Sequence, residues 1–293
     1  MYKIAGHTMG TPEYNIYEAI ELMERIGADG IEIVIQDGYQ SGLPCNCSKE
    51  ELEKVKQYAD NHHVQIICLT PYNSYFNSLD ESQRRSEIEE IKRIIEYCVY
   101  FNAKYIRIYG GNLVAGDTDH YEEKWEALVQ SLKELGEAAE DKGVTLVVEN
   151  HFNTMTVSAK ESAALMKDVN HPAVRILYDQ ANLTFTEQED YEEAIRIQQQ
   201  YVGYIHVKDL VFQEGKPFAS SDVARPSDDE RNVYTRIVGE GVIKWPEILK
   251  LIKKQGYEGW LSLEYERRWH PDDIPDASVG MKKSLEYLQS LAI

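Results

Sequence analysis

Cysteine is scarce in this sequence, with four residues in a chain of 293. So few cysteines exclude a disulfide-rich scaffold. Cys45 and Cys47 form a C-x-C pair, with no second pair to complete a structural zinc site. The opening residues have no charged segment followed by a long apolar run, which a secretory signal needs. We therefore expect a protein of the reducing cytoplasm.

Basic side chains are also in short supply, because 31 lysines and arginines face 50 aspartates and glutamates, for a formal charge of −19. Nucleic-acid binding depends on basic residues that neutralise phosphates, and an anionic membrane surface repels a protein of this charge. The chain also has no run of about 18 apolar residues that would span a bilayer. These deficits argue against nucleic acid and membranes as partners and favour a small molecule.

Short apolar runs rich in β-branched residues alternate with longer stretches of helical period along the whole chain. We expect strands at 3–7, 30–35, 65–70, 105–109, 145–151, 174–179, 202–209 and 259–265. We expect helices at 14–27, 48–61, 81–101, 122–141, 158–168, 188–199, 245–254 and 280–290. Eight strands in strict alternation with eight helices predict an α/β fold, a single (β/α)8 TIM barrel over residues 1–293.

Local signals support this division of the chain. Ser48 with Glu51, and Ser158 with Glu161, match the capping box that begins a helix. Residues 210–244 show no regular period, so we expect a lid or insertion loop there, after the seventh strand. A doubly wound open sheet is the competing topology, but no G-x-G-x-x-G motif follows a strand to support a dinucleotide site.

Ionisable side chains stand at the ends of four successive expected strands, where a barrel places its chemistry. They are Glu149, Asp179, His206 and Glu264. Three unpaired carboxylates at one barrel mouth would raise one another's pKa, and a divalent cation removes this conflict. Three oxygens and one imidazole nitrogen suit Mn²⁺, Mg²⁺, Co²⁺ or Fe²⁺ better than a thiolate-rich zinc site. Alternatively, each residue caps a loop or pairs with a basic side chain.

The same segments carry a family resemblance. The motifs are V-E-N-H at Glu149, Y-D-x-x-N at Asp179, H-V-K-D at His206, L-E-Y-E at Glu264 and a G-x-G-x-(I/V)-x-W segment at 239–245. Together they resemble the sugar isomerase/epimerase branch of the xylose isomerase-like TIM barrels, over essentially the whole chain. The resemblance implies one divalent metal on these four residues, commonly Mn²⁺ with Zn²⁺ also possible. It further implies that Glu149 and Glu264 remove and return a proton on either side of the substrate carbon.

Two positions depart from the ketose 3-epimerases of that family. Asn182 stands where those enzymes usually have a histidine, and the arginine that contacts their substrate after the seventh-strand histidine is not evident. Lys208 instead follows His206 by two residues. Lys208 is a candidate to polarise a substrate oxygen or to protonate a leaving hydroxyl. Alternatively, it only pairs with Asp209.

His151 lies two residues after Glu149, so the two side chains share one face of an extended strand, with Asn150 opposite. A neutral histidine beside the metal would serve as the base of an elimination. The alternative is a histidine that only bonds to a loop. The candidate substrate contacts are His7, Tyr109, Asn182, Arg236 and Glu266.

Further arginines have two interpretations. Arg267 and Arg268 follow the last strand, where barrels often bind phosphate, or they belong to a rim of ion pairs. Arg225, Arg231 and Arg236, in the 210–244 loop, are candidates to close over an anion or to face a partner subunit.

The leading hypothesis is therefore a metal-dependent isomerase or epimerase of a sugar or polyol, which abstracts a proton next to a carbonyl. The alternative is a lyase on the same scaffold, which dehydrates or β-eliminates from a keto-sugar, because elimination needs a base such as His151 and an acid such as Lys208. Family members often form homo-oligomers, so a homo-oligomer and a complex with a partner subunit are both candidate assemblies here.

Overall fold

Eight parallel strands close into a barrel in this computed structural model, which describes residues 2–114, 116–186, 188–213, 231–291 and 293. The strands are β1 Lys3–His7, β2 Gly30–Ile35, β3 Gln65–Pro71, β4 Tyr105–Tyr109, β5 Thr145–Glu149, β6 Val174–Tyr178, β7 Val202–Val207 and β10 Trp260–Leu263. β10 pairs with β1 and completes the ring. The predicted (β/α)8 barrel is confirmed, and each expected strand lies within a few residues of its predicted bounds.

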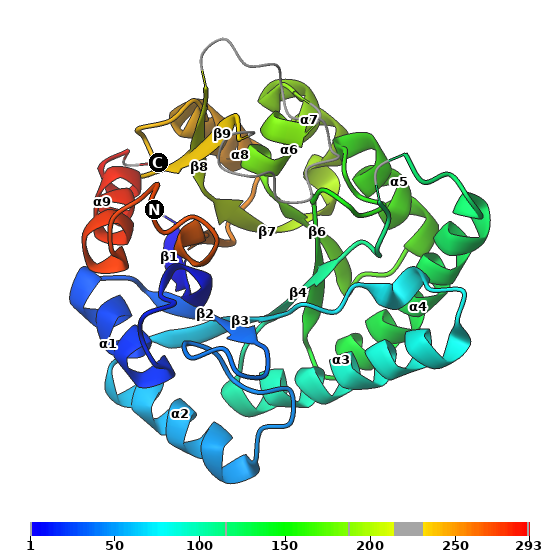
Figure 1. The fold of residues 1–293 in the computed structure, drawn as a ribbon, viewed down its shortest axis with the longest axis horizontal. Coiled ribbons are helices and arrows are strands. Elements are labelled where there is room, and N and C mark those ends of the chain that lie inside the picture. The colour runs from blue at the N-terminus through cyan, green and yellow to red at the C-terminus, as the bar shows by residue number, and fades with distance from the viewer. Residues whose placement is uncertain (1, 115, 187, 214–230, 292) are drawn as a thin grey trace.

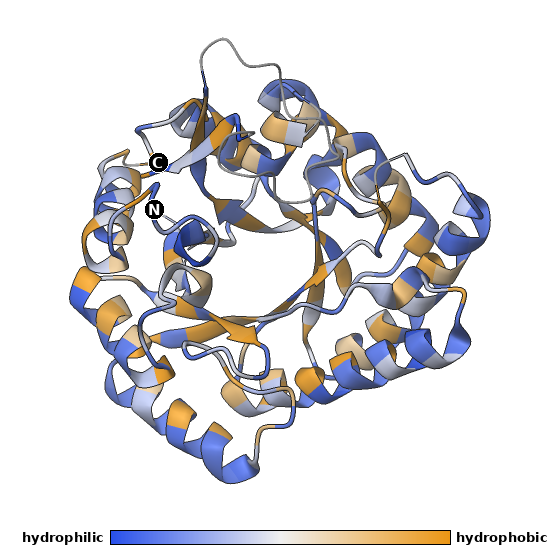
Figure 2. Cartoon of the chain, viewed as in Figure 1, coloured by the Kyte–Doolittle hydropathy of each residue, from blue (hydrophilic) through white to orange (hydrophobic). Residues whose placement is uncertain are grey.

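Helices surround the barrel on its outside (Figure 1). They are α1 Ile16–Ile26, α2 Lys49–Asn61, α3 Glu81–Phe101, α4 Tyr121–Glu140, α5 Ala159–Val169, α6 Gln180–Thr186, α7 Tyr191–Gln198, α8 Trp245–Lys254 and α9 Ala277–Ser290. Hydrophilic residues follow the outward sides of this ring (Figure 2). In α3, for example, Ile88, Ile91 and Ile95 are buried while the charged residues between them face away, as helical periodicity requires.

The predicted capping boxes are present. Ser48 accepts the backbone N–H of Glu51 at the start of α2, and the Glu51 carboxylate accepts the backbone N–H of Ser48. Ser158 and Glu161 make the same reciprocal pair at the start of α5. Both helices therefore begin where the sequence signal places them.

The barrel has two apolar regions. A large buried cluster fills the space between strands and helices, and a second cluster comes from strand residues whose side chains face the barrel axis. Tyr105, Tyr204 and Leu177 belong to this inner cluster. Parallel strands start together at one end of a barrel and finish together at the other. The inner cluster therefore fills the part of the barrel nearer the strand starts, and the carboxyl ends of the strands are left for polar groups.

Two short elements differ from the sequence prediction. Residues at both ends of the expected 210–244 loop form an antiparallel ribbon, β8 Asp209–Phe212 with β9 Val233–Arg236, while 214–230 lie outside the described residues. The helix α6 follows β6 at once, because Asp179 Oδ1 accepts the backbone N–H of Asn182 at 2.9 Å and caps its first turn.

No helix in the described part of the chain combines the length and apolarity needed to cross a bilayer.

Candidate active site

The four predicted metal ligands converge at the carboxyl end of the barrel. Each of Glu149, Asp179, His206 and Glu264 offers one ligand atom, and these four atoms lie within 4.8 Å of one another. All four residues are buried. The barrel closure brings together side chains that are spread over more than a hundred residues of sequence.

The donor atoms fit a divalent cation. Among the described residues, His206 Nδ1 has no hydrogen-bond partner, although it lies 3.4 Å from Glu264 Oε1 and 3.6 Å from Glu149 Oε1. Asp179 Oδ2 is 3.0 Å from Lys208 Nζ but accepts no well-directed hydrogen bond. Burial raises the pKa of Asp179 to about 7, although the positive charge of Lys208 acts to lower it. Buried oxygens and an imidazole nitrogen turned toward one point form the donor set that such cations take.

A carboxylate that the sequence reasoning missed holds His206 from the other side. Both Glu32 oxygens lie 3.1 Å from His206 Nε2, and Thr70 and Tyr204 donate to them at 2.5 and 3.1 Å. The proton of a neutral His206 therefore sits on Nε2, and the Nδ1 lone pair points to the other carboxylates. Carboxylates fix metal-binding histidines in this way. The available signal was a glutamate inside the apolar run 30–35, since a buried charge needs a partner.

His7 belongs to the same network. Its Nδ1 accepts the backbone N–H of Met9 at 3.0 Å, so a neutral ring carries its proton on Nε2, 3.4 Å from Glu32 Oε1. His7, Glu32 and His206 also meet the distance requirement for a metal cluster. Thr70 and Tyr204 already donate to the Glu32 oxygens, whereas His7 Nε2 makes no hydrogen bond among the described residues, so this trio is a second group whose atoms could hold a cation.

A second missed residue, Arg107 on β4, pairs with Glu149. Arg107 Nε donates to Glu149 Oε2 at 2.6 Å, and the guanidinium lies 3.7 Å from the centre of the Tyr109 ring. The other oxygen, Oε1, accepts from the Asn182 amide at 3.2 Å. Burial opposes the ionisation of Glu149, but Arg107 outweighs it and lowers the pKa to about 2. Glu149 is consequently a firmly ionised carboxylate and a weak base.

His151 has the geometry of a neutral base. Its Nδ1 lies 2.7 Å from the carbonyl oxygen of Phe152, so this nitrogen donates and Nε2 keeps its lone pair. Burial lowers the pKa of His151 to about 4, despite the nearby Glu149. Asn150 points to the opposite side and donates to Ser162 at 2.6 Å, which is the alternation expected of an extended chain.

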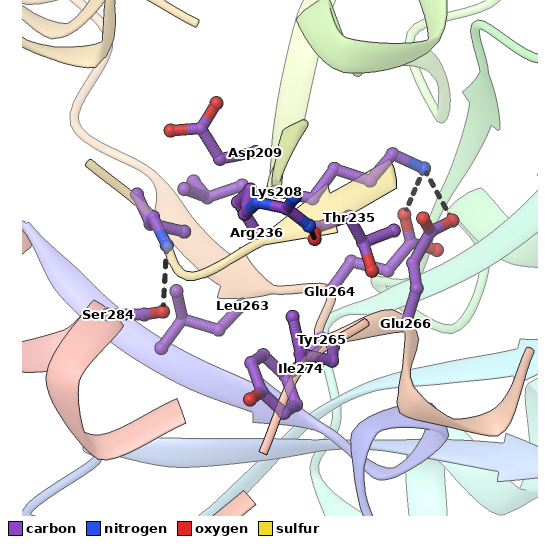
Figure 3. A pocket seen from close by; sticks show the side chains of 12 residues that line it. Lys208, Asp209, Thr235, Arg236, Leu263, Glu264, Tyr265, Glu266, Ile274 and Ser284 are labelled. Carbon is purple, nitrogen blue, oxygen red and sulfur yellow. Dashed lines mark hydrogen bonds and ion pairs between the residues drawn. The ribbon is translucent and has the colours of Figure 1, made fainter. Parts of the chain in front are cut away.

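Lys208 extends from the end of β7 into the same mouth. Its Nζ lies 2.7 Å from Glu264 Oε2 and 3.3 Å from Glu266 Oε1 (Figure 3). It also lies 3.0 Å from Asp179 Oδ2. Asp209, the next residue, points the opposite way in the same view. The alternative in which Lys208 only pairs with Asp209 is therefore wrong, since its three carboxylate partners are all at the barrel mouth.

Asp209 instead organises the chain that follows β9. Its carboxylate accepts the backbone N–H groups of Gly239, Gly241 and Ile243 at 2.9 to 3.1 Å. A Cβ atom on Gly241 would lie 2.1 Å from Asp209 Oδ1, so the close approach requires glycine here. The indole N–H of Trp245 donates to the Lys208 carbonyl at 3.0 Å. The G-x-G-x-(I/V)-x-W segment thus holds the backbone of Lys208 in place.

A cavity of about 800 Å³ opens at this end of the barrel. Of the predicted site residues, Tyr109, His151, Lys208, Glu264 and Glu266 line it. The other three predicted substrate contacts lie elsewhere. His7 and Asn182 are buried beneath the cavity, where His7 Nε2 lies 3.4 Å from Glu32 and the Asn182 amide donates to Glu149. Arg236 lines a separate small space and donates to the Thr235 carbonyl.

The arginines considered for anion binding are largely paired. Arg231 lines the cavity and forms an ion pair with Asp273 at 2.5 Å. Arg267 pairs with Glu13 at 2.7 Å, and Arg268 packs against the rings of Tyr39 and Trp269. Arg231 and Arg267 thus form ion pairs, whereas Arg268 forms none among the described residues and donates to the Gln36 side chain. Arg225 lies outside the described residues.

Comparison with known proteins identifies the class of this barrel. Residues 20–291 match the family described as xylose isomerase-like TIM barrel. The chain belongs to this family.

Individual relatives fall within the same group of barrels. Inosose dehydratases from Geobacillus thermodenitrificans and Bacillus anthracis are 27% identical over 146 residues and 29% identical over 150 residues, in each case 50% of this chain and 48% of the relative. The chain therefore spans about half the length of these curated relatives in the matched region. The solved structure of 3-keto-D-glucoside 4-epimerase YcjR from E. coli is 15% identical with a TM-score of 0.76, covering 99% of this chain and 100% of that one. The IOLI protein with a bound zinc atom is 20% identical with a TM-score of 0.77, covering 99% and 97%.

Proposed function

We propose that this protein is a divalent-metal-dependent lyase that eliminates a group from a keto-sugar or related polyol. The observation that carries this proposal is the state of His151, whose Nδ1 is committed to the Phe152 carbonyl and whose Nε2 keeps its lone pair in a residue that lines the cavity. Lys208, a charged acid, lines the same cavity. An elimination requires both a base and an acid in one site.

Glu149, Asp179, His206 and Glu264 would hold the metal. When bound, a divalent cation polarises a carbonyl oxygen and so acidifies the neighbouring C–H bond. Mn²⁺ is the ion we expect, and Mg²⁺, Co²⁺, Fe²⁺ and Zn²⁺ suit the same donors. The fit rests on the convergence of the four donor atoms and on the unsatisfied His206 Nδ1.

The proton would leave the sugar carbon for His151 Nε2. Glu149 is less suited to this step, because Arg107 and Asn182 already engage its two oxygens. Lys208 would donate a proton to the departing oxygen. Its ammonium is surrounded by Asp179, Glu264 and Glu266, which hold it in its charged form.

The curated relatives support the same class of reaction. The inosose dehydratases match this chain over about half of their length, and dehydration of a keto-polyol is an elimination next to a carbonyl.

An isomerase or epimerase remains the second candidate, and one observation favours it. Glu264 lines the cavity and lies in the same four-residue cluster as Glu149, which is the arrangement that a two-glutamate proton exchange needs. In this reaction Glu264 would be the base, and His151 would take no part in proton transfer.

Product analysis separates the two reactions. The Mn²⁺-loaded protein is incubated in D2O with ketoses, inososes and 3-keto-glycosides, and the products are followed by NMR. Elimination predicts loss of water or of an alcohol and a new unsaturated ketone, with no epimer. Turnover should stop when a chelator removes the metal and return when Mn²⁺ is added.

The variant His151→Ala distinguishes the roles of the candidate bases. We expect a loss of at least about 100-fold in kcat for a base of an elimination, whereas an epimerase that uses the glutamates would lose little. His62→Ala is the matched control, since His62 lies at the end of α2 beside Glu24. Epimer formation with normal activity in His151→Ala would refute the lyase.

A further inference from the structure

A strip of aromatic rings forms one wall of the cavity. Its members Tyr72, Tyr109, His151, Phe152 and Phe185 all line the cavity. Successive ring centres lie 6.2 Å apart for Tyr72 and Tyr109, 4.7 Å for Tyr109 and His151, 4.1 Å for His151 and Phe152, and 5.6 Å for Phe152 and Phe185. The candidate base is therefore the middle member of a continuous aromatic surface.

This strip is longer than one sugar ring can cover. All five residues are partly exposed, although aromatic side chains contribute most to stability when they are buried. The cavity, at about 800 Å³, lies in the upper part of the range that accommodates drug-sized ligands. Both features point to a substrate with an apolar, planar part attached to the sugar.

The charges of the described residues that line the cavity argue against a phosphate in that position. Lys208 is surrounded by carboxylates, and Arg231 is paired with Asp273. Glu266 and Asp272 add negative charge to the lining. An anionic group would therefore meet cations that already have partners, whereas the aromatic strip offers stacking to a neutral ring.

We propose that the leaving group is a phenolic aglycone, so that the substrate is an aryl glycoside of a keto-sugar. This inference rests on the proposed lyase function and adds the substrate class. His151 takes the proton from the carbon between the carbonyl and the anomeric carbon, and that C–H electron pair forms a C=C bond to the anomeric carbon. The anomeric C–O bond breaks, and its oxygen takes a proton from Lys208. A phenol and an unsaturated keto-sugar result, with no net oxidation or reduction.

Binding and turnover are measured separately. Phenyl β-D-glucoside and methyl β-D-glucoside lack the ketone and cannot react, so calorimetry with Mn²⁺-loaded protein reports binding alone. Their 3-keto derivatives report elimination through the release of phenol or methanol. We expect the phenyl glucoside to bind at least about 10-fold better than the methyl glucoside, because a phenyl group buries more apolar area. Phenol is also the better leaving group, so the effect of the strip is measured from binding and from the change of the phenyl preference in a strip variant.

Phe185→Leu tests the strip itself, since it removes one ring without a direct contact to His151 among the ring contacts of the described residues. The preference for phenyl over methyl should narrow about 3–10-fold, the range of one aromatic contact. Phe101→Leu is the control, because Phe101 is buried in α3, which packs on the outer side of the barrel. The preference of this variant for phenyl over methyl compounds should equal that of the parent protein.

The outcomes distinguish the two proposals. Equal binding and turnover of phenyl and methyl compounds would overturn the aryl substrate class and leave the lyase standing. Preferential phenyl binding without release of phenol would overturn the lyase and support an aromatic subsite. Release of phenol that exceeds release of methanol, with the preference narrowed in Phe185→Leu, supports both.

Discussion

Replacing Arg107 with methionine would leave the Glu149 carboxylate buried without its counter-ion. Arg107 is 2% exposed and Glu149 is fully buried, so water cannot take the place of the guanidinium. Methionine retains much of the length and apolar volume of the arginine stem. The variant therefore isolates the loss of charge and hydrogen bonding from a loss of packing.

The size of the effect follows from the burial of this pair. Removing one partner of a buried ion pair costs about 3–5 kcal/mol, because the remaining charge is neither solvated nor paired. For a large domain each kcal/mol lowers Tm by about 2–4 °C, which predicts a drop of about 6–20 °C in the metal-free protein. The Asn182 amide at 3.2 Å stays in place but carries no charge to offset the carboxylate.

Thermal unfolding of the metal-free protein measures this drop. Arg107→Met combined with Glu149→Gln should recover most of it, since no unpaired charge then remains. Arg196→Met is the matched control, because Arg196 and Glu193 form an exposed pair on α7 that is worth at most about 1 kcal/mol. A Tm within about 2 °C of the parent in Arg107→Met would refute the reasoning.

Three further predictions concern residues that support the site. Glu32→Gln should weaken Mn²⁺ binding about 10–100-fold by calorimetry, because the carboxylate that orients His206 is lost, while unchanged affinity would argue against this role. Gly241→Ala should lower the unfolding temperature and the activity together, since its Cβ would collide with Asp209; an unaffected variant would contradict the observed contact. Ser158→Ala removes the cap of α5 and should cost about 0.5–2 kcal/mol in urea unfolding with activity retained.

Much of the architecture was predictable because it depends on neighbours in sequence. Strand and helix periods, and caps such as Ser48 with Glu51, act over a few residues and were found where expected. The convergence of Glu149, Asp179, His206 and Glu264 was also predictable, since one topological rule places the ends of all parallel strands at the same mouth.

The partners of those four residues were decided by tertiary structure alone. Glu32 meets His206 across 174 residues of chain, and Arg107 meets Glu149 across 42. Each contact depends on barrel closure and register, which local periodicity does not encode. The sequence by itself determined that carboxylates and a histidine meet at one mouth. The tertiary structure decided which carboxylate pairs with Arg107 or Lys208 and which histidine nitrogen keeps a free lone pair, because electrostatic interaction depends on distance in space, which barrel closure and register set.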